Sequence, residues 1–225
     1  YSSNTMRVAD YIARTLVDHG VRDVFMVTGG GAMHLNDAIG RCRGLRYVCW
    51  HHEQACAIAA QGYYRLTNRP AAVNVTTGPG GTNAITGVYG AFVDSMGMLV
   101  ISGQVKIETT VRYTGLPLRQ YGDQELDIEH IVKPITKYAT MVTDPQSIRY
   151  HLEKALYLAT SGRPGPCWLD IPLDVQGAMI DPDSLEGFDP AELDEPWKAT
   201  DVDAAAREVL QKLHEAERPV VFAGS

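Results

Sequence analysis

Apolar and polar positions along the first 178 residues follow two periods. In some stretches apolar residues recur every three or four positions, as in amphipathic helices, and in others they form short continuous runs, as in buried strands. Helices are predicted around residues 8–16, 35–39, 84–92 and 148–159, and strands at 24–27, 47–50, 71–75, 98–101 and 167–171. Short apolar strands separated by helices predict an α/β fold, a doubly wound parallel sheet with helices on both faces.

The pattern changes after residue 178. Residues 179–200 are rich in Asp, Glu and Pro and lack periodicity, which is typical of a surface linker. A helix is predicted after Asp201 and a strand at 219–223. We therefore expect a first domain over residues 1–178, a linker over 179–200, and the beginning of a second α/β domain, cut short, over 201–225.

Unusual loops follow four of the predicted strands. They are Gly29–Gly31, the segment at Glu53, the Gly-Pro-Gly-Gly run at 78–81, and Gly103 with Gln104; residues 103–124 are predicted to form a longer loop. Ligands on parallel sheets bind outside the carboxyl ends of the strands. We expect these loops to converge on one edge and form a site.

Glu53 is the first candidate for chemistry. An apolar run, expected to be a buried strand, leads into it, and a helix rich in small residues follows. A carboxyl group buried there loses hydration, which favours its protonated form and suits a general acid or base. A surface charge at a helix N-terminus is the plain alternative. Because His51, His52 and Glu53 are adjacent and HExxH is absent, a metal site is disfavoured.

The glycine turn at 78–81 has two interpretations. It is either a simple turn into a helix or a place where the backbone approaches a flat ligand closely, since glycine has no Cβ. GxGxxG and GxxxxGK[ST] are absent, which weakens the case for a nucleotide-phosphate cradle and for a nicotinamide-dependent dehydrogenase. Taken singly, Gln104, Gln124 and Glu125 are typical of capping or solvated loop residues.

Composition narrows the class of protein. The net charge is −7 and Lys/Arg-rich blocks are absent, which argues against a nucleic-acid partner. Apolar runs of about 20 residues are also absent, so we expect no membrane span. The start lacks the pattern of a signal peptide, and the four cysteines form no CxxC pair, so we expect a cytoplasmic protein with buried free thiols.

Six segments together carry a resemblance to a known family. They are His-Glu-Gln-Ala at 52–55, Ala-Ala-Gln-Gly-Tyr at 59–63, Thr-Gly-Pro-Gly-Gly-Thr-Asn at 77–83, Ser-Gly-Gln-Val at 102–105, Gln-Glu at 124–125 and the run at 159–166. In this order they resemble the acetolactate synthase-like branch of thiamine diphosphate enzymes. The match is to the N-terminal, pyrimidine-binding domain over roughly residues 6–180, and 201–225 are similar to the start of the middle domain.

The resemblance implies roles for particular residues. Glu53 matches the glutamate that hydrogen-bonds N1′ of the aminopyrimidine, and Gln104 matches a catalytic glutamine lining the reaction space. The implied cofactor-binding residues are Glu53, Thr77, Gly78, Pro79 and Asn83, and the implied substrate-lining residues are Gly30, Gly31, Ala32, His34 and Gln124. The sequence departs from the family at Thr28–Gly31, one residue longer than a Pro-Gly-Gly, and at 112–120, so specificity for acetolactate is not implied.

The family's diphosphate- and Mg²⁺-binding motif, Gly-Asp-Gly followed by Asn, is missing; Gly122-Asp123-Gln124 breaks it. The chain is therefore expected to be a fragment, or else part of a split enzyme, that works with such a domain in at least a homodimer. The implied activity is decarboxylation of pyruvate or another 2-oxo acid and transfer of the two-carbon unit, as a transferase or lyase. The alternative is a non-catalytic pyrimidine-like partner subunit. Whether the middle domain binds FAD, ADP or nothing stays open.

Overall fold

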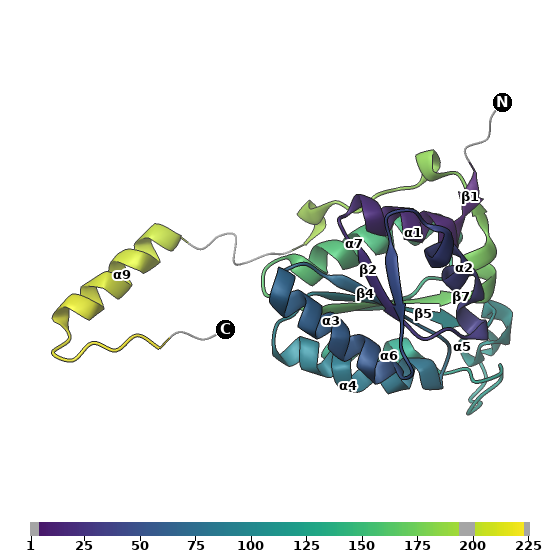
Figure 1. Ribbon diagram of the computed structural model, residues 1–225, viewed down its shortest axis with the longest axis horizontal. Coiled ribbons are helices and arrows are strands. Elements are labelled where there is room, and N and C mark those ends of the chain that lie inside the picture. The colour runs from purple at the N-terminus through teal and green to yellow at the C-terminus, as the bar shows by residue number, and fades with distance from the viewer. Residues whose placement is uncertain (1–4, 194–200, 223–225) are drawn as a thin grey trace. The chain divides into compact units, whose positions relative to one another are not determined.

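The computed structural model describes residues 5–193 and 201–222 (Figure 1). The chain forms two compact units, Tyr1–Pro190 and Ala191–Ser225. Residues 179–190 of the predicted linker belong to the first unit, and residues 194–200 lie outside the described residues. The last residue of the predicted strand 219–223 also lies outside them.

A six-stranded sheet forms the centre of the first unit. Its order is β3-β2-β4-β5-β7-β6, and every neighbouring pair is parallel. The strands are β2 (Asp23–Met26), β3 (Arg46–Cys49), β4 (Ala71–Val75), β5 (Met98–Gln104), β6 (Tyr138–Met141) and β7 (Pro166–Pro172). A separate antiparallel pair joins β1 (Met6–Arg7) to β8 (Met179–Ile180). The predicted fold class is confirmed.

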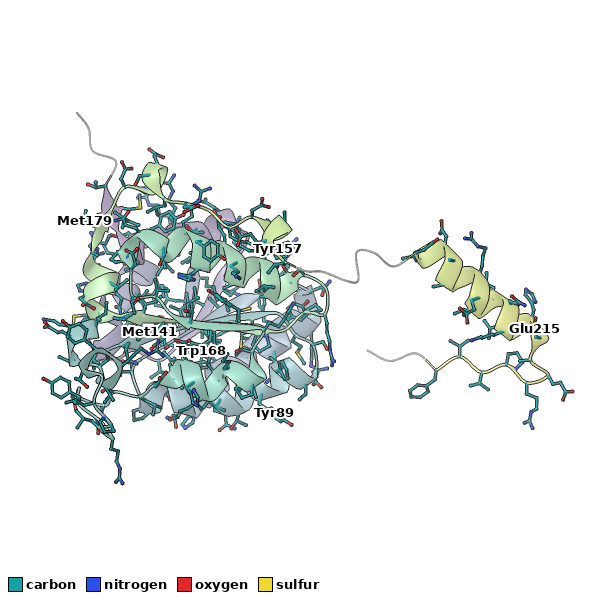
Figure 2. The ribbon with its side chains drawn as sticks, turned by 180° about the vertical axis from the view of Figure 1, so that it is seen from behind. Tyr89, Met141, Tyr157, Trp168, Met179 and Glu215 are labelled. Carbon is teal, nitrogen blue, oxygen red and sulfur yellow. The ribbon has the colours of Figure 1, made fainter. Side chains whose placement is uncertain are left out.

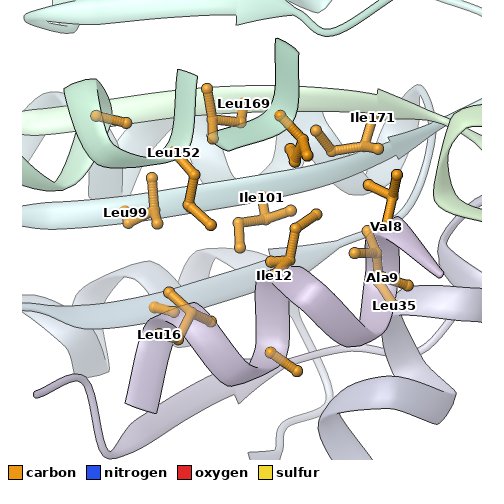
Figure 3. Packing of buried hydrophobic residues seen from close by; sticks show 14 of the residues in the cluster. Val8, Ala9, Ile12, Leu16, Leu35, Leu99, Ile101, Leu152, Leu169 and Ile171 are labelled. Atoms are coloured by element: carbon orange, nitrogen blue, oxygen red, sulfur yellow. The ribbon is translucent and has the colours of Figure 1, made fainter. Parts of the chain in front are cut away.

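Helices cover both faces of the sheet, each over its own apolar core. One core contains side chains of α1 (Val8–Asp18), α2 (Met33–Arg41), α7 (Ile148–Thr160) and α8 (Leu173–Gly177). Figure 3 shows Ile12 and Leu16 of α1 and Leu152 of α7 meeting Leu99 and Ile101 of β5. The other core contains side chains of α3 (Glu53–Thr67), α4 (Pro79–Val93) and α6 (Ile128–Val132).

The strand order contains a switch point between β2 and β4. The chain passes from β2 outward to β3 and then returns to the other side of β2 to form β4. Connections that leave two neighbouring strands in opposite directions open a crevice at their carboxyl ends, where ligands bind in doubly wound sheets. The loops that follow β2 and β4 contain Gly29–Gly31 and Gly78, so the fold places two of the predicted loops at this crevice.

Four sequence predictions need correction. The strand before Glu53 is not buried: β3 lies at the edge of the sheet, and Tyr47 is 50% exposed. The helix after the glycine turn begins at Pro79 rather than near residue 84. The predicted loop 103–124 contains the end of β5 and the short α5 (Val111–Thr114). Strand β6 was not predicted, because Thr140 interrupts its apolar residues and the strand is mostly half-buried at the other edge.

The second unit contains the predicted helix, α9 (Val202–Glu215), which begins where the Asp201 side chain accepts a hydrogen bond from Ala204 N at 2.9 Å. The predicted strand at 219–223 is wrong over its described residues, 219–222. A strand needs a neighbouring strand to pair with, and none is described in this unit. Phe222 is 97% exposed.

Candidate functional site

Glu53 is the first residue of α3, as predicted, and its residue exposure is only 8%. The preceding His52 caps the helix, with Nδ1 accepting a hydrogen bond from Gln54 N at 3.1 Å. Asn83 of α4 donates from Nδ2 to Oε2 of Glu53 at 3.0 Å. Helices α3 and α4 lie side by side (Figure 1), so Glu53 is held between two helices that begin at the same edge of the sheet.

The glycine turn lies directly beside this carboxyl group. Gly78 has φ of 58° and ψ of −109°, a backbone conformation that side chains rarely allow. Pro79 then starts α4, where its missing N–H costs nothing. A Cβ on Gly80 would lie 3.5 Å from Oε1 of Glu53 and 2.8 Å from Cγ2 of Thr76. Glycine at position 80 therefore keeps the space next to Oε1 free of side-chain atoms.

The loop after β2 is fastened to the end of β4. Gly31 N donates to Oγ1 of Thr76 at 3.1 Å, and Thr77 Oγ1 donates to the carbonyl of Gly103 at 3.1 Å. A Cβ on Gly31 would overlap Oγ1 of Thr77, and a Cβ on Gly103 would overlap the carbonyl of Gly31. Three loops thus meet at glycines, and the hydroxyl groups of Thr76 and Thr77 join them, so the strand ends converge as predicted.

A cavity of about 810 Å³ opens at this edge. Four residues expected at the site contribute to its lining: Gly30, Gly31, Thr77 and Gln124. Gln124 has φ of 58°, which is uncommon for a residue with a side chain. Its carbonyl lies where a Cβ on Gly78 would point, so this segment is packed against the glycine turn.

The lining does not contain the other expected residues. Those at the glycine turn and beside it are Glu53, Gly78, Pro79 and Asn83, whereas Ala32, His34 and Gln104 lie elsewhere. Ala32 is fully buried in the core beneath α2, and the ring of His34 packs against Gly177 of α8. Gln104 lines a different cavity, of about 420 Å³, together with Arg112 and other residues of the segment from 110 to 141. The substrate-lining roles of Ala32 and His34 and the catalytic role of Gln104 stay predictions.

The sequence of the chain has clear relatives. The protein-family profile described as "Thiamine pyrophosphate enzyme, N-terminal TPP binding domain" matches residues 6–131. The chain belongs to this family. Relatives of similar sequence include proteins named acetolactate synthase, so the predicted resemblance to the N-terminal, pyrimidine-binding domain of acetolactate synthase-like thiamine diphosphate enzymes is confirmed.

Three of these relatives show how far the likeness extends. The chain is 34% identical over 223 residues to the acetolactate synthase large subunit of Buchnera aphidicola subsp. Acyrthosiphon pisum, covering 96% of this chain and 36% of that protein. The same figures describe the likeness to the isozyme 3 large subunit of Escherichia coli. The chloroplastic acetolactate synthase of Arabidopsis thaliana is 33% identical over 220 residues, covering 96% of this chain and 31% of that protein. The chain therefore spans about a third of the length of these curated relatives.

The sequence predictions did not include the structural role of two carboxylates, which hold neighbouring segments in place by hydrogen bonds. Glu125, expected to be solvated when considered singly, accepts hydrogen bonds from three backbone N–H groups, of Val111 at 2.5 Å, Tyr121 at 3.1 Å and Gly122 at 3.3 Å. It therefore ties the two ends of the 111–122 loop together. An acidic residue after two glycine-containing turns was the available signal in the sequence.

Asp170, in the middle of β7, is the second missed carboxylate. It is 2% exposed and accepts hydrogen bonds from Ser102 and Gln104 of β5. Burial raises the pKa of Asp170 to about 7, and the charge of Asp127 adds to the rise. The hydrogen bonds from Ser102 and Gln104 and the charge of Arg112 lower the pKa and offset part of this rise. A single acid within the apolar run 167–171 was the signal in the sequence.

The cysteines lie apart from the site's hydrogen bonds, and the described residues form no metal cluster or membrane helix. All four cysteines are free; Cys56 and Cys167 are buried as expected, whereas Cys42 is half-buried and Cys49 is exposed. Burial, with the nearby charge of Glu53, raises the pKa of the Cys56 thiol to about 12. Over residues 5–193 and 201–222, no cluster of three or more His, Cys, Asp or Glu could hold a metal ion. In the same residues, no helix has the length and apolar character needed to cross a membrane.

Proposed function

We propose that this chain is the pyrimidine-binding part of an enzyme that decarboxylates pyruvate or a related 2-oxo acid and transfers the two-carbon unit to an acceptor carbonyl. In this proposal Glu53 is the catalytic residue that activates the cofactor. The observation that carries the proposal is the position of the Glu53 carboxyl group, which is buried, held by Asn83, and next to a turn kept open by Gly80. The relatives named acetolactate synthase support the type of reaction.

The glycine turn and the Glu53 carboxyl group fit the aminopyrimidine ring of thiamine diphosphate. A flat ring needs a surface without side chains, which the turn at Gly78 and Gly80 offers, and a polar partner at its edge, which Glu53 offers. Pro79 and Asn83 are exposed at the start of α4 and would hold the ring, with Thr77, two residues after β4. When bound, this cofactor would supply a carbon nucleophile for the carbonyl of a 2-oxo acid and an electron sink for the electron pair left behind by CO₂.

The part played by Glu53 is to hold and return a proton at its carboxyl group. Asn83 occupies Oε2, which leaves Oε1 to face the space beside Gly80. A carboxyl group in this position shares a proton with the N1′ nitrogen of a pyrimidine that enters the space, and the low exposure of Glu53 keeps competing water away. Gln124, Gly30 and Gly31 would border the substrate, because they line the neighbouring cavity.

The remaining components of the enzyme belong to the proposal as well. Mg²⁺ and the diphosphate group would be bound by a domain that this sequence does not contain, and the functional unit would be at least a dimer. FAD is an open candidate for the middle domain. A cytoplasmic location remains our expectation, although some relatives are named as chloroplastic. A non-catalytic partner subunit is less well supported, because Glu53 and an open glycine turn would serve no purpose in it.

The experiment that tests this function is a decarboxylation assay with the complete polypeptide. ¹³CO₂ release from [1-¹³C]pyruvate and from [1-¹³C]2-oxobutanoate is measured with and without thiamine diphosphate and Mg²⁺, together with the carboligation products. We expect release that requires the cofactor. A preparation that binds thiamine diphosphate but releases no CO₂ from either acid would contradict the enzymatic proposal and favour the non-catalytic alternative.

A further inference from the structure

A chain of buried hydrogen bonds crosses two neighbouring strands of the sheet. Trp168 Nε1 donates to Ser102 Oγ at 2.8 Å, and Ser102 Oγ donates to Oδ1 of Asp170 at 2.5 Å. Gln104 Nε2 donates to Oδ2 of Asp170 at 2.9 Å. Figure 2 shows Trp168 inside the first unit, between the helices on either face of the sheet. All four side chains are at most 2% exposed, so water does not replace these partners.

Gln104 connects this network to the segment that borders the large cavity. Its Nε2 also donates to the carbonyl of Leu126 at 2.8 Å, and its Oε1 accepts a hydrogen bond from Val105 N at 3.0 Å. Leu126 is two residues beyond Gln124, whose carbonyl packs against Gly78. The contacts therefore run without a gap from the core of the sheet to the glycine turn.

The direction of the Gln104 amide is set by its partners. Two acceptors, on Asp170 and Leu126, meet the NH₂ group, and one donor, Val105 N, meets the carbonyl oxygen. If the amide turned over, its oxygen would face the oxygens of Asp170 and Leu126, and its NH₂ group would face the N–H of Val105. Each partner therefore disfavours the reversed orientation. Asp170 is the partner in this set that is anchored in the sheet by a second hydrogen bond, from Ser102.

We propose that Asp170 is a positioning residue, which orients Gln104 and thereby holds the 122–126 segment, with Gln124, against the glycine turn. Asp170 would not touch the substrate or the cofactor itself. The inference rests on the proposed function only for its catalytic consequence, since the positioning of the segment is a property of the fold. The large cavity would then be bordered correctly only while the amide of Gln104 donates to Leu126.

Four single variants of the complete polypeptide, and one double variant, test this. Asp170→Ala and Gln104→Met break the connection to Leu126. Asp170→Asn keeps it, because its amide oxygen accepts from Gln104 while its NH₂ group turns to Ser102 Oγ, which can accept. Ser102→Ala is the matched control, since it removes a hydrogen bond from Asp170 but leaves the connection to Gln104 intact.

The first readout is hydrogen–deuterium exchange of the peptide that spans residues 120–128, measured by mass spectrometry. Loss of one hydrogen bond corresponds to about a fivefold faster exchange in the segment that it holds. We expect this acceleration in Asp170→Ala and Gln104→Met, no further acceleration when the two are combined, and near-parental exchange in Asp170→Asn and Ser102→Ala. If Asp170→Ala does not fold, Asp170→Leu, an apolar residue of similar size, takes its place, and Gln104→Met against Ser102→Ala still decides whether the Gln104 amide holds the segment.

The second readout is kcat and KM for the 2-oxo acid per folded enzyme. We expect Asp170→Ala and Gln104→Met to have the same kinetic effect, a higher KM or a lower kcat. Asp170→Asn should keep the parental values. Equal effects of Ser102→Ala and Asp170→Ala on exchange, or no effect of Gln104→Met, would overturn the inference and leave Asp170 a core residue only. If the parental polypeptide has no turnover, the proposed function fails, and the exchange measurement still decides the positioning role.

Discussion

The buried carboxyl group of Asp170 makes the stability of the fold depend on pH in a defined direction. Its pKa is raised from the ordinary 3.8 to about 7 by burial, so the folded chain binds this proton more tightly than the unfolded chain does. The stabilisation is fully present below pH 4 and is lost as pH rises to about 7. Since a tenfold change in proton affinity corresponds to about 1.4 kcal/mol, the loss amounts to about 4 kcal/mol.

Asp170→Asn isolates this contribution, because an amide does not titrate. Urea unfolding of both proteins at constant ionic strength, from pH 4.5 to 8.5, is followed by tryptophan fluorescence, to which Trp168 contributes from inside the network. We expect the parent to lose most of that 4 kcal/mol relative to the variant between pH 4.5 and 7, and the difference to stay constant above about pH 7.5. Asp144→Asn, at an exposed helix cap, controls for removing a carboxylate from the surface. A difference that is the same at every pH, or that moves in the parent's favour as pH rises, would refute the reasoning.

Two pairs of glycine substitutions test the packing of the loops at the site and of helices α3 and α4. Gly31→Ala should lower the free energy of unfolding in urea by about 1–3 kcal/mol and impair cofactor binding, because its Cβ would overlap Oγ1 of Thr77. Gly30→Ala has open space around its Cβ and should keep the parental stability, so equal losses of stability in the two variants would contradict this. Gly87→Ala should push α4 away from α3 and also cost about 1–3 kcal/mol, whereas Gly62→Ala, free of neighbours within α3, should stabilise the helix by up to about 1 kcal/mol. A Gly87→Ala protein as stable as its parent would show that this helix contact is not tight.

Local patterns in the sequence predicted most of the architecture. The periods of apolar residues located the strands β2, β4, β5 and β7, and the position of Glu53 at the start of a helix followed from the small residues after it. The edge position of β3 did not follow. The apolar residues of β3 resemble those of a buried strand. The order of the strands decides which one lies at the edge, and no single segment of the sequence encodes that order.

The site itself was predictable only in part. Loops that follow parallel strands must share an edge, so the meeting of Gly31 with Thr77 was foreseeable. The burial of Ala32 could have been seen, because Ala32, Leu35 and Ile39 share one helical face. The pairing of Asp170 with Gln104 joins residues 66 positions apart through strand register, which local reasoning cannot supply.

The central claim is that the carboxyl group of Glu53 handles the proton that activates the cofactor. The most direct measurement is the rate at which the C2 proton of thiamine diphosphate exchanges with solvent deuterium in the complete enzyme, compared between the parent, Glu53→Gln, and Glu186→Gln, an exposed control. We expect exchange to fall by a factor of about 10² to 10⁴ in Glu53→Gln, with circular dichroism and thiamine diphosphate binding retained, and to be unchanged in Glu186→Gln. Exchange at the parental rate in a folded, cofactor-bound Glu53→Gln enzyme would contradict the account.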